Sequence, residues 1–549
     1  MTEELNDKKF VKRVFKIGIN VDSRNEKKPE VEIEEVEAEV KTENVEIRQA
    51  KSKKRIPSEY QEKIYEFIKN QVLIIQNHGK PQNLMCKAGA GCGKSTTLVE
   101  SLNFIPKYLN VIFLAFNKDI VEALRSKVPT NCRVQTFHSA GFAALRYRFK
   151  NVKLDDKKML SIFQNLMDTS YRSLTQEESG GLLSPFLKLV GLLKNTLVDS
   201  SDSNLLELID KYNIEIEDVD ENILFELIRE GLRISNSNPH IIDYNDMIYL
   251  PIKLGLSFFK VDVCFVDETQ DLNNAQLVMI RKMVKDNGLI VMVGDPNQSI
   301  YGFRGADIEA MQRMKEELKA EELPLMETYR CGKKIVDLAR ELVPDLVAYS
   351  ENPDGEIKEI VYDQFYELVK EKDMVLCRNN APMIKPVFHL LAQGVKVSIK
   401  GRDIGEGLVR LVKKLKAFTM EDFYTKLDKW KAGEEKKARR RKSDSMMQQI
   451  EDKYECLMVI SEDCKNVNEI IAKIEKIFSD DRSEIIFSSI HRAKGLESER
   501  VFILEPQLIP SKHANKEWEI QQERNILYVA ITRTKMNLYL VAGEINTKF

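Results

Sequence analysis

The sequence predicts an α/β protein in which buried parallel sheets are interrupted by mainly helical insertions. Short apolar runs recur along the chain and end in polar residues; examples span residues 111–118, 263–271, 289–298, 374–380, 484–495 and 538–544. Helical segments separate these runs, and continuous apolar strands joined by helices are typical of parallel sheets buried on both faces. Because ligands bind at the carboxyl ends of such strands, we expect the polar residues there to form the functional site.

Two stretches lack this alternation of strands and helices. Residues 145–240 and 405–480 are expected to be helical, and the second stretch is also highly charged. Setting them apart leaves two α/β domains and a charged N-terminal tail that is expected to be disordered. The predicted units are a tail at 1–55, a first α/β domain at 56–144 and 241–325, an insertion at 145–240, a second α/β domain at 326–404 and 481–549, and a reduced insertion at 405–480.

Composition limits the classes of function. Lys and Arg number 84 against 86 Asp and Glu, so the net charge of −2 predicts no overall attraction to nucleic acid, and any such surface must be local. The eight cysteines form no CxxC pair and the six histidines are scattered, which disfavours a disulfide framework and a zinc site. Cysteines inside apolar runs, such as Cys264 and Cys377, are expected to be buried thiols.

Targeting signals are also absent from the sequence pattern. The N-terminus has no apolar leader, and nowhere do ~18 uncharged apolar residues run together. We therefore expect a soluble protein of the cytoplasm or host-cell interior, or of the nucleus in a eukaryote, that is neither secreted nor bound to a membrane.

The stretch at residues 84–98 passes from apolar residues into a glycine-rich loop that ends in Gly93, Lys94 and Ser95. Small residues let successive backbone N–H groups curl around a polyphosphate, and Lys94 can reach its terminal phosphates. Ser95 follows where a hydroxyl can ligate magnesium. The first loop position is Ala88 where the strict pattern has glycine, and a chance glycine-rich turn between strand and helix is the alternative. The candidate loop comprises Ala88, Gly89, Ala90, Gly91, Cys92, Gly93, Lys94, Ser95 and Thr96.

Two adjacent acids, Asp267 and Glu268, follow another apolar strand. Beside a phosphate loop this pair has a chemical meaning. Asp267 can hold the magnesium through water, while Glu268 can orient and deprotonate an attacking water. Adjacent acids after a strand are also common helix N-caps. The combination with Lys94 favours a nucleotide site over a cap.

With these motifs in view, the chain resembles the superfamily 1 DNA helicases of the UvrD/Rep/PcrA type. Ten segments carry the resemblance, in the family's order and over residues 57–543: EYQEKIYEF, AGAGCGKST, LAFNKDIVEAL, QTFHSAG, DYNDMI, VDETQDLNNAQ, VGDPNQSIYGFRGAD, ETYRCGKKI, SSIHRAKGLESERVFI and ERNILYVAITRTK. The AFNK and TFHSAG forms are similar to the F-box DNA helicase and phage-encoded branch. The resemblance implies two RecA-like domains, ATP and Mg²⁺ as cofactors, and an ATP-dependent DNA helicase.

The resemblance also implies roles for residues around the nucleotide. Gln61 corresponds to the glutamine that reads the adenine edge, and Tyr329 to the aromatic that stacks on the base. Glu497 corresponds to the acid that meets the ribose, and Gln298 to the sensor of the γ-phosphate.

Two arginines, Arg330 and Arg533, correspond to those that reach the γ-phosphate from the second RecA-like domain. Physical chemistry supports this role, because a planar fork of donors supplied across a cleft stabilises the charge on the transferred phosphoryl group only when the cleft is closed. A surface salt bridge is the alternative for either arginine. The expected catalytic set is Lys94, Asp267, Glu268, Gln298, Arg330 and Arg533.

A further set of residues is expected to contact single-stranded DNA. Tyr301, Phe303 and Arg304 follow a strand at spacings that suit base stacking, worth ~1–3 kcal/mol per base, and a phosphate contact. These aromatics could instead belong to the core, and Phe303 replaces the tryptophan common in the family. The resemblance adds Phe116, Asn117, His138 and His491. Either histidine could equally be a structural one.

The resemblance implies a motor in which closing and opening of the cleft move a single strand, 3′ to 5′, and split the duplex ahead. Expected partners are single-stranded DNA and junctions of single- and double-stranded DNA, bound by a monomer or a DNA-induced oligomer. The alternatives are a translocase that displaces bound proteins with little unwinding, an RNA helicase, and an inactive scaffold, which the intact catalytic residues disfavour. Replication, repair and recombination are all open as the process served, and no nuclease motif is apparent.

The second insertion departs most from the family. Only residues 405–480 are left for it, whereas the inserted domain of Rep and UvrD is large, so an autoinhibitory or partner-docking role is in doubt. Its basic run at 436–442 could contact duplex DNA or be a solvated helix. The basic run at 51–55 is expected to be a solvated linker, with a nuclear address or a nucleic-acid contact as alternatives. The Val/Glu alternation at 30–40 could form a strand.

Overall fold

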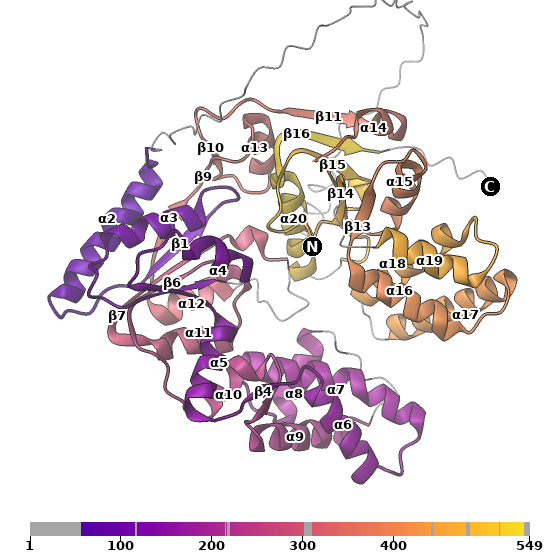
Figure 1. Ribbon diagram of the computed structural model, residues 1–549, viewed down its shortest axis with the longest axis horizontal. Coiled ribbons are helices and arrows are strands. Elements are labelled where there is room, and N and C mark those ends of the chain that lie inside the picture. The colour runs from indigo at the N-terminus through magenta and orange to yellow at the C-terminus, as the bar shows by residue number, and fades with distance from the viewer. Residues whose placement is uncertain are drawn as a thin grey trace, which may run out of the picture.

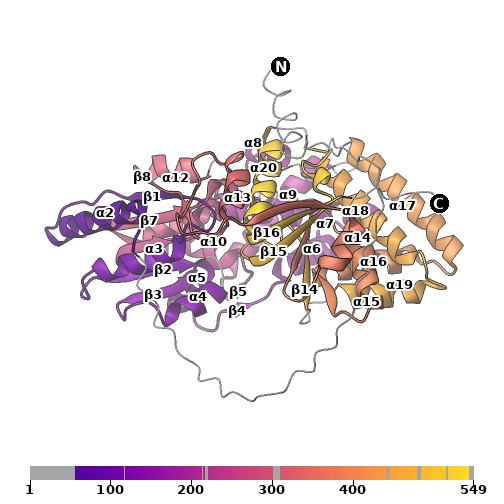
Figure 2. The same cartoon turned by 90° about the horizontal axis from the view of Figure 1, so that it is seen from above.

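The structure is a computed structural model that describes residues 56–115, 118–212, 214, 216, 220–300, 310–440, 444–478, 484–514 and 517–542. Two six-stranded sheets lie side by side, each with helices on both faces (Figure 1, Figure 2). Within each sheet all neighbouring strands run parallel. The predicted α/β class with two parallel-sheet domains is therefore confirmed.

The first sheet has the strand order β3-β2-β6-β7-β1-β8. Its strands are β1 (Leu84–Ala88), β2 (Val111–Ala115), β3 (Cys132–Thr136), β6 (Val261–Val266), β7 (Val284–Gly294) and β8 (Glu321–Leu325). One face is covered by α2 (Glu59–Gln76), α3 (Lys94–Ser101) and α4 (Lys118–Arg125). The other face is covered by α5 (Phe137–Arg148), α10 (Asp246–Lys253), α11 (Asn274–Met283) and α12 (Ala310–Leu318).

Helices α6 (Lys158–Thr169), α7 (Gln176–Thr196), α8 (Asp202–Lys211) and α9 (Glu221–Ser237) pack around an apolar cluster of their own beneath the first sheet (Figure 1). Short strands β4 (Lys153–Leu154) and β5 (Ile241–Ile242) pair where this segment leaves and rejoins the sheet domain. A buried cluster of charges lies at the same junction. Lys194 Nζ is 2.6 Å from Asp243 Oδ2 and 2.8 Å from Asp246 Oδ1, and Lys158 Nζ is 2.6 Å from Asp246 Oδ2.

The second sheet has the strand order β11-β16-β15-β12-β14-β13. Its strands are β11 (Glu356–Ile360), β12 (Met374–Cys377), β13 (Val397–Lys400), β14 (Ile485–Ser489), β15 (Ser498–Leu504) and β16 (Thr534–Val541). Helices α13 (Lys333–Arg340), α14 (Tyr362–Leu368), α15 (Ala381–Ala392) and α20 (Glu517–Thr532) pack against it. A two-stranded pair, β9 (Glu327–Thr328) and β10 (Val347–Ala348), precedes it.

Helices α16 (Arg402–Leu415), α17 (Met420–Arg440), α18 (Asp444–Ser461) and α19 (Val467–Ile477) share one hydrophobic core with the second sheet. Phe423 of α17 and Ile474 of α19 are buried in the same cluster as Phe487 of β14. Polar contacts also fix the segment, because Asp452 on α18 accepts hydrogen bonds from the backbone N–H groups of Asn380 and Ala381 at the start of α15. Helices α18 and α19 thus join the segment to α15 and β13, and α16 and α17 pack on these two helices.

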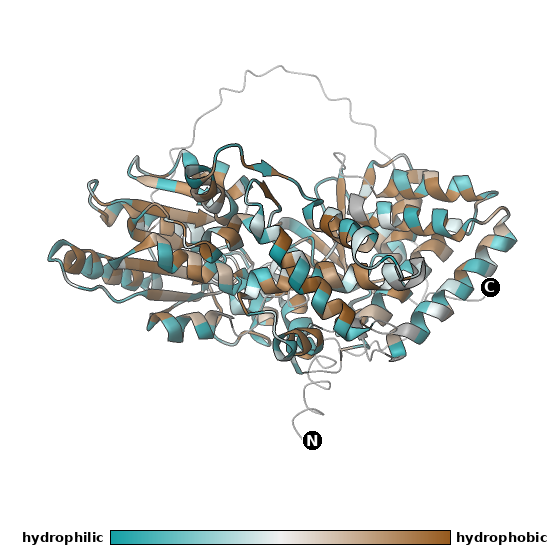
Figure 3. Cartoon of the chain, turned by 90° about the horizontal axis from the view of Figure 1, so that it is seen from below, coloured by the Kyte–Doolittle hydropathy of each residue, from teal (hydrophilic) through white to brown (hydrophobic). Residues whose placement is uncertain are grey.

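Hydropathy along the helices explains their placement. Figure 3 shows hydrophobic and hydrophilic residues alternating along the outer helices, as expected where one face packs on a sheet. Cys264 in β6 and Cys377 in β12 are buried, as predicted. None of the described helices is long and apolar enough to cross a membrane. The predicted tail at 1–55 and part of the basic run at 436–442 lie outside the described residues.

Candidate nucleotide site and nucleic-acid interface

The glycine-rich loop connects the end of β1 to the start of α3 at Lys94. Gly91 and Gly93 have φ values of 72° and 76°, in the left-handed region that favours glycine. A Cβ on Gly91 would lie 2.5 Å from Cβ of Arg330, so this position also demands glycine for close approach to the second domain. Ala88, the departure from the strict loop pattern, is the last residue of strand β1 and lies before the tight turn.

Strands β1, β6 and β7 are neighbours, and their carboxyl ends bring together Lys94, Asp267 and Asp295. Desolvation acts to lower the pKa of Lys94, but the carboxylates of Glu268 and Asp295 outweigh it and the pKa is raised. Asp295 is fully buried, and burial raises its pKa. Lys94 is therefore a protonated cation held among acids at the end of the loop.

Asp267 and Ser95 form the candidate metal site. Ser95 Oγ donates a hydrogen bond to Asp267 Oδ2 at 2.5 Å. Burial and the neighbouring charge of Glu268 raise the pKa of Asp267 to about 6. A hydroxyl and a carboxylate oxygen are ligands that Mg²⁺ accepts, usually with several waters. The donor chemistry of this pair therefore fits the ion that the resemblance implies.

Glu268 lies beside Asp267 but differs from it in ionisation. Desolvation acts to raise the pKa of Glu268, yet the positive charges of Lys94 and Lys494 bring it below its ordinary value. Its backbone has a φ of 52°, which is a strained conformation for a residue with a side chain. Gln270 Nε2 donates to Glu268 Oε2 at 2.6 Å and orients the carboxylate. Two adjacent carboxyls with diverging pKa values are typical of sites where the two groups have different chemical tasks.

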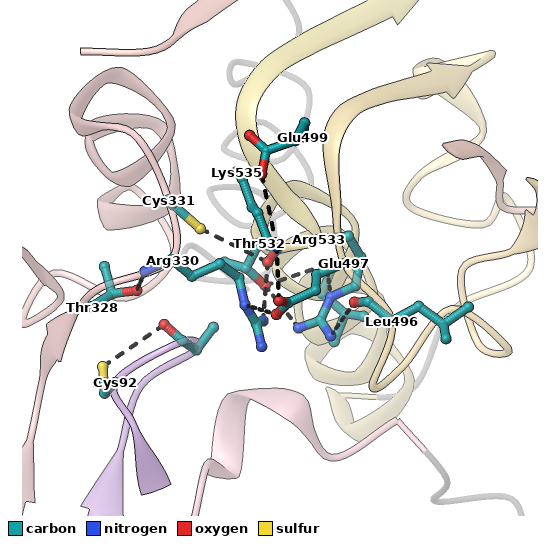
Figure 4. Close-up of polar contacts among 12 residues, drawn as sticks. Cys92, Thr328, Arg330, Cys331, Leu496, Glu497, Glu499, Thr532, Arg533 and Lys535 are labelled. Atoms are coloured by element: carbon teal, nitrogen blue, oxygen red, sulfur yellow. Dashed lines mark hydrogen bonds and ion pairs between the residues drawn. The ribbon is translucent and has the colours of Figure 1, made fainter. Parts of the chain in front are cut away.

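Gln298 and Arg533 meet across the cleft between the two sheet domains. Gln298 Nε2 donates to Asp295 Oδ2 at 2.7 Å, and Gln298 Oε1 lies 3.5 Å from Arg533 Nη2. Arg533 is 1% exposed and donates from Nε to the Val529 carbonyl and from Nη1 to the Leu496 carbonyl, both at 3.1 Å (Figure 4). Burial and the nearby Arg330 lower the pKa of Arg533 to about 10, so it stays charged at neutral pH.

Arg330 approaches the same cleft from the segment after β9. Its Nε is 2.7 Å from Glu497 Oε2, and its Nη1 donates to the Thr532 carbonyl at 3.3 Å (Figure 4). Lys535 Nζ is 3.1 Å from the other carboxylate oxygen of Glu497. Glu497 is thus held between two cations, and the salt bridge considered as an alternative for Arg330 is present within the site itself.

Gln61 and Tyr329, the two residues predicted to contact the base, precede and follow the phosphate loop in the sequence. Gln61 Nε2 donates to Thr97 Oγ1 on α3 at 2.9 Å, and its Oε1 accepts from the backbone of Ser58 in the capping box that starts α2. The backbone N–H of Tyr329 donates to the Gly91 carbonyl at 3.1 Å. Both predicted base-contacting residues are therefore joined to the loop or its helix.

Of the predicted DNA-contacting residues, the structure describes two. His138 lies in the first turn of α5, where burial lowers its pKa and keeps the ring neutral. His491 lies in the turn after β14, on the second domain. Each histidine therefore follows the carboxyl end of a strand, one in each domain. The others lie outside the described residues: Phe116, Asn117, Tyr301, Phe303 and Arg304.

Three residues inside the quoted motifs make cross-domain contacts that sequence reasoning missed. Lys494 Nζ is 2.6 Å from Asp271 Oδ2, and Asn525 Nδ2 donates to the Ser299 carbonyl at 2.8 Å. The hydroxyl of Tyr528 accepts from the Ala90 N–H at 2.9 Å. A signal existed only for Tyr528, because a tyrosine inside the apolar run NILYVAIT needs a partner for its hydroxyl when buried.

The fold and the site define a class: a P-loop nucleotide-binding protein in which two RecA-like domains meet over the phosphate loop. The model of the UvrD/REP helicase N-terminal domain matches residues 70–319, and the model of the UvrD-like helicase C-terminal domain matches residues 484–541. The chain belongs to the UvrD/Rep helicase family.

Individual relatives agree with this assignment. A probable DNA helicase II homolog of Mycoplasma capricolum is 24% identical over 86% of this chain and 83% of its own length. The ATP-dependent DNA helicase Rep of Buchnera aphidicola is 25% identical over 52% of this chain and 42% of its own length. F-box DNA helicase 1 of Gallus gallus is 25% identical over 85% of this chain. The chain spans only 48% of that relative's length, and less than half of the Rep relative's.

Proposed function

We propose that this protein is an ATP-driven motor that translocates on single-stranded DNA and unwinds duplex DNA. The observation that carries the proposal is the convergence of Arg533 and Arg330 from the second domain on Gln298 and the phosphate loop of the first. An arginine that reaches the phosphates from across a cleft acts only when the cleft is closed, which couples hydrolysis to domain movement.

The chain's residues divide the chemistry among them. Lys94 and the loop N–H groups hold the polyphosphate of ATP, and Ser95 and Asp267 hold the metal. Bound Mg²⁺ supplies charge neutralisation between the phosphates. Glu268, whose pKa is lowered, takes the proton of the attacking water. Arg330 and Arg533 stabilise the charge that develops on the transferred phosphoryl group. Gln298 senses the γ-phosphate and transmits its presence to the segment at 295–299.

Base and ribose contacts complete the nucleotide site. Gln61 reads the adenine edge and Tyr329 stacks on the base. Glu497 meets the ribose, which requires it to exchange part of its pairing with Arg330 and Lys535 when nucleotide binds. We also propose the domain boundaries predicted from the sequence. The first RecA-like domain comprises residues 56–144 and 241–325, and the second comprises 326–404 and 481–549.

The strand is gripped on both domains. His138 on the first domain and His491 on the second belong to this track, together with Tyr301, Phe303, Arg304, Phe116 and Asn117. Alternate gripping during closing and opening moves the strand in one direction. We propose movement 3′ to 5′ and binding at junctions of single- and double-stranded DNA by a monomer or a DNA-induced oligomer. The names of the DNA helicase II and Rep relatives support DNA as the substrate.

One observation favours a second candidate function. The second insertion is reduced to helices α16 to α19, which share the core of the second sheet, so it is small compared with the inserted domain of Rep and UvrD. A motor of this build can also translocate and displace bound proteins with little unwinding. Parallel assays of strand separation and of removal of a bound protein from single-stranded DNA distinguish the two functions.

The test of the proposed function is the rate of ATP hydrolysis with and without single-stranded DNA. We expect DNA to stimulate the parent protein, Lys94→Ala to abolish turnover, and Arg533→Ala to reduce it by a factor of 10³ or more, as for arginines supplied to a phosphoryl group. Single-stranded RNA of the same sequence is the matched control. Equal or greater stimulation by RNA would contradict DNA as the substrate, and no stimulation by either would contradict the motor.

A further inference from the structure

The end of α5 and the segment after it carry positive charge with no acidic residue among them. Residues 137–154 contain four cations and no Asp or Glu. All four are exposed, and within the described chain none of them forms an ion pair with a carboxylate. We call this surface the α5 strip; it consists of Arg146, Tyr147, Arg148, Lys150 and Lys153. In a chain with a net charge of −2, it is a local basic surface.

Tyr147 is 90% exposed between the two arginines of the strip. The guanidinium groups of its neighbours lean on other rings, Arg146 over Phe142 at 5.7 Å and Arg148 over Phe149 at 5.4 Å. These contacts hold the cations beside the helix and leave the face of Tyr147 uncovered. An uncovered aromatic ring between backbone-neutralising cations is the arrangement that proteins use to stack an unpaired base.

His138 and Tyr147 of the α5 strip lie on the same helix, but nine residues at about 100° each place Tyr147 on the side of α5 opposite to His138. α5 has 12 residues, a length of ~18 Å. The segment at 240–244 runs beside it, since the ring of Tyr244 lies 6.4 Å from that of His138 and the ring of His240 lies 5.8 Å from that of Phe149. Tyr244 is 56% exposed. The segment at 240–244 therefore lines the His138 side of α5, and Tyr147 of the strip lies on the other side.

Packing fixes the strip in place. A Cβ on Gly141 would lie only 1.9 Å from the Met247 carbonyl oxygen, so the inner face of α5 is held tightly against α10. Beyond the helix, Lys153 pairs in register with Ile241 in the β4–β5 ladder. Arg146, Tyr147 and Arg148 project in three directions from the exposed end of α5 and are thus presented from a rigid support.

The carboxylates beneath this surface do not offset its charge. Asp243 and Asp246 are buried and are compensated by two buried lysines, Lys194 and Lys158. These four charges cancel locally, so the acids nearest to the strip in sequence that remain uncompensated by them are Asp155 and Asp156, which follow Lys153.

We propose that the α5 strip is a binding site for single-stranded nucleic acid beside the junction with helices α6 to α9, on the side of α5 opposite to His138. Tyr147 stacks on an unpaired base, while Arg146 and Arg148 contact the flanking phosphates. The proposal rests on the proposed function for single-stranded DNA as the ligand, and it adds a subsite outside the motifs that carry the resemblance.

The experiment measures binding of fluorescent DNA oligonucleotides by anisotropy at several salt concentrations. The short probe is the shortest oligonucleotide that fully stimulates ATP hydrolysis by the parent, and the long probe is several nucleotides longer at either end. The variants are Tyr147→Ala and the pair Arg146→Gln with Arg148→Gln. The matched controls are Tyr108→Ala and the pair Lys69→Gln with Lys107→Gln. These exposed residues lie on or near α2, where Gln76 Nε2 donates to the Tyr108 hydroxyl at 2.7 Å. Tyr108 comes before the amino end of β2, whereas α5 follows the carboxyl end of β3.

We expect Tyr147→Ala to weaken binding of the long probe roughly ten-fold, in the range for one stacked base, and to leave the short probe unchanged. The arginine pair lowers the slope of log K against log salt by ~1.4, since each phosphate contact on a single strand contributes ~0.7. Both variants keep the parent's ATPase rate with saturating short probe, which shows that they are folded. The controls keep the parent's affinity and slope.

Parent-like affinity and slope for both variants on the long probe would overturn the proposal. A loss confined to blunt duplex DNA would also overturn it, because the occupant would then be a duplex. Failure of the proposed function looks different: the parent's ATPase would not respond to DNA. In that case the short probe is the shortest oligonucleotide whose binding saturates the parent protein. The comparison of long and short probes then still tests whether the α5 strip binds single-stranded nucleic acid.

Discussion

The hydroxyl of Tyr528, on helix α20 of the second domain, accepts a hydrogen bond from the backbone N–H of Ala90 in the phosphate loop of the first, at 2.9 Å. One turn earlier on the same helix, Asn525 donates to the Ser299 carbonyl. Both side chains are buried, at 0% and 2% exposure. Helix α20 of the second domain therefore contacts both the phosphate loop and the segment that follows β7. A displacement of the loop is thus transmitted through α20 to that segment.

Tyr528→Phe tests this link by removing only the hydroxyl. The Ala90 N–H then lacks its acceptor in the nucleotide-free protein, and we expect the free energy of unfolding to fall by about 1–2 kcal/mol. Because the lost bond joins two domains, we also expect a larger radius of gyration in small-angle scattering. Tyr362→Phe is the control, since its hydroxyl bonds Glu505 within the second domain at 2.8 Å. A scattering change of equal size in the control would contradict the interdomain role of Tyr528.

Lys494 and Asp271 form a second cross-domain link, with Lys494 Nζ also donating to the Gln298 carbonyl at 2.7 Å. Lys494→Met leaves the buried Asp271 carboxylate unpaired, a change that costs about 3–5 kcal/mol unless the cleft opens to water. We expect an opened cleft and slower ATP turnover. Adding Asp271→Asn removes the unpaired charge, so a double-mutant cycle should give a coupling energy of at least about 1 kcal/mol.

Arg378→Met is the matched control for that cycle, because Arg378 pairs with Glu523 inside the second domain at 2.5 Å. It is expected to lower stability without opening the cleft. Additive effects of Lys494→Met and Asp271→Asn would show that the two side chains do not interact in solution.

ATP hydrolysis is expected to fall at low pH because of Asp267. Burial and Glu268 raise its pKa to about 6, so Asp267 becomes protonated as the pH falls through about 6 and no longer serves as a metal ligand. We expect kcat/KM for ATP to decline along an acid limb with a midpoint near that pH. A midpoint below about 4.5 would contradict the raised pKa.

Stability provides an independent readout of the same group. A carboxyl whose folded-state pKa lies above its unfolded value is disfavoured once ionised, so the free energy of unfolding falls as the pH rises from about 4 to 6. Asp267→Asn removes this term. In urea titrations without nucleotide, the variant should gain stability relative to the parent between pH 4 and 6 and keep the gain above pH 6.

Packing of the second insertion is tested by two phenylalanines on neighbouring stretches of chain. Phe423→Ala empties a fully buried position in the core shared with the second sheet, and we expect a loss of about 3–5 kcal/mol in a single unfolding transition of that whole unit. Phe418→Ala changes a side chain that is 91% exposed, and stability should stay within about 0.5 kcal/mol. A separate early transition for Phe423→Ala would indicate that the insertion folds on its own.

The strand patterns and the phosphate loop could be predicted because they depend on local chemistry. The run at 263–266 is apolar throughout, and the structure places it in the buried strand β6 (Val261–Val266) with Asp267 directly after it. Glycine at positions 91 and 93 was predicted to allow a tight loop, and both residues adopt positive φ. The roles assigned to individual site residues stay predictions, and five of the DNA-contacting ones fall outside the described chain.

Contacts between distant segments could not be predicted in this way. The sequence around Tyr528 does not indicate that its hydroxyl bonds the backbone of Ala90, which is 438 residues away. The ion pair of Arg330 with Glu497 also depends on how β15 and the segment after β9 are brought together. The core that α16 to α19 share with the second sheet could not be predicted either. The pattern of an amphipathic helix indicates which face is buried, but it does not indicate which element packs against that face.

The amino-acid sequence by itself therefore determined the α/β class, the phosphate loop and the family of this protein, since these follow from periodicity and from motifs of a few adjacent residues. Only the tertiary structure decided which residues of the second domain contact the phosphate loop and which charged side chains pair with one another. It also decided where the exposed basic side chains of α5 lie. These properties arise from distances across the cleft and between helices, and such distances are set by the packing of the whole chain.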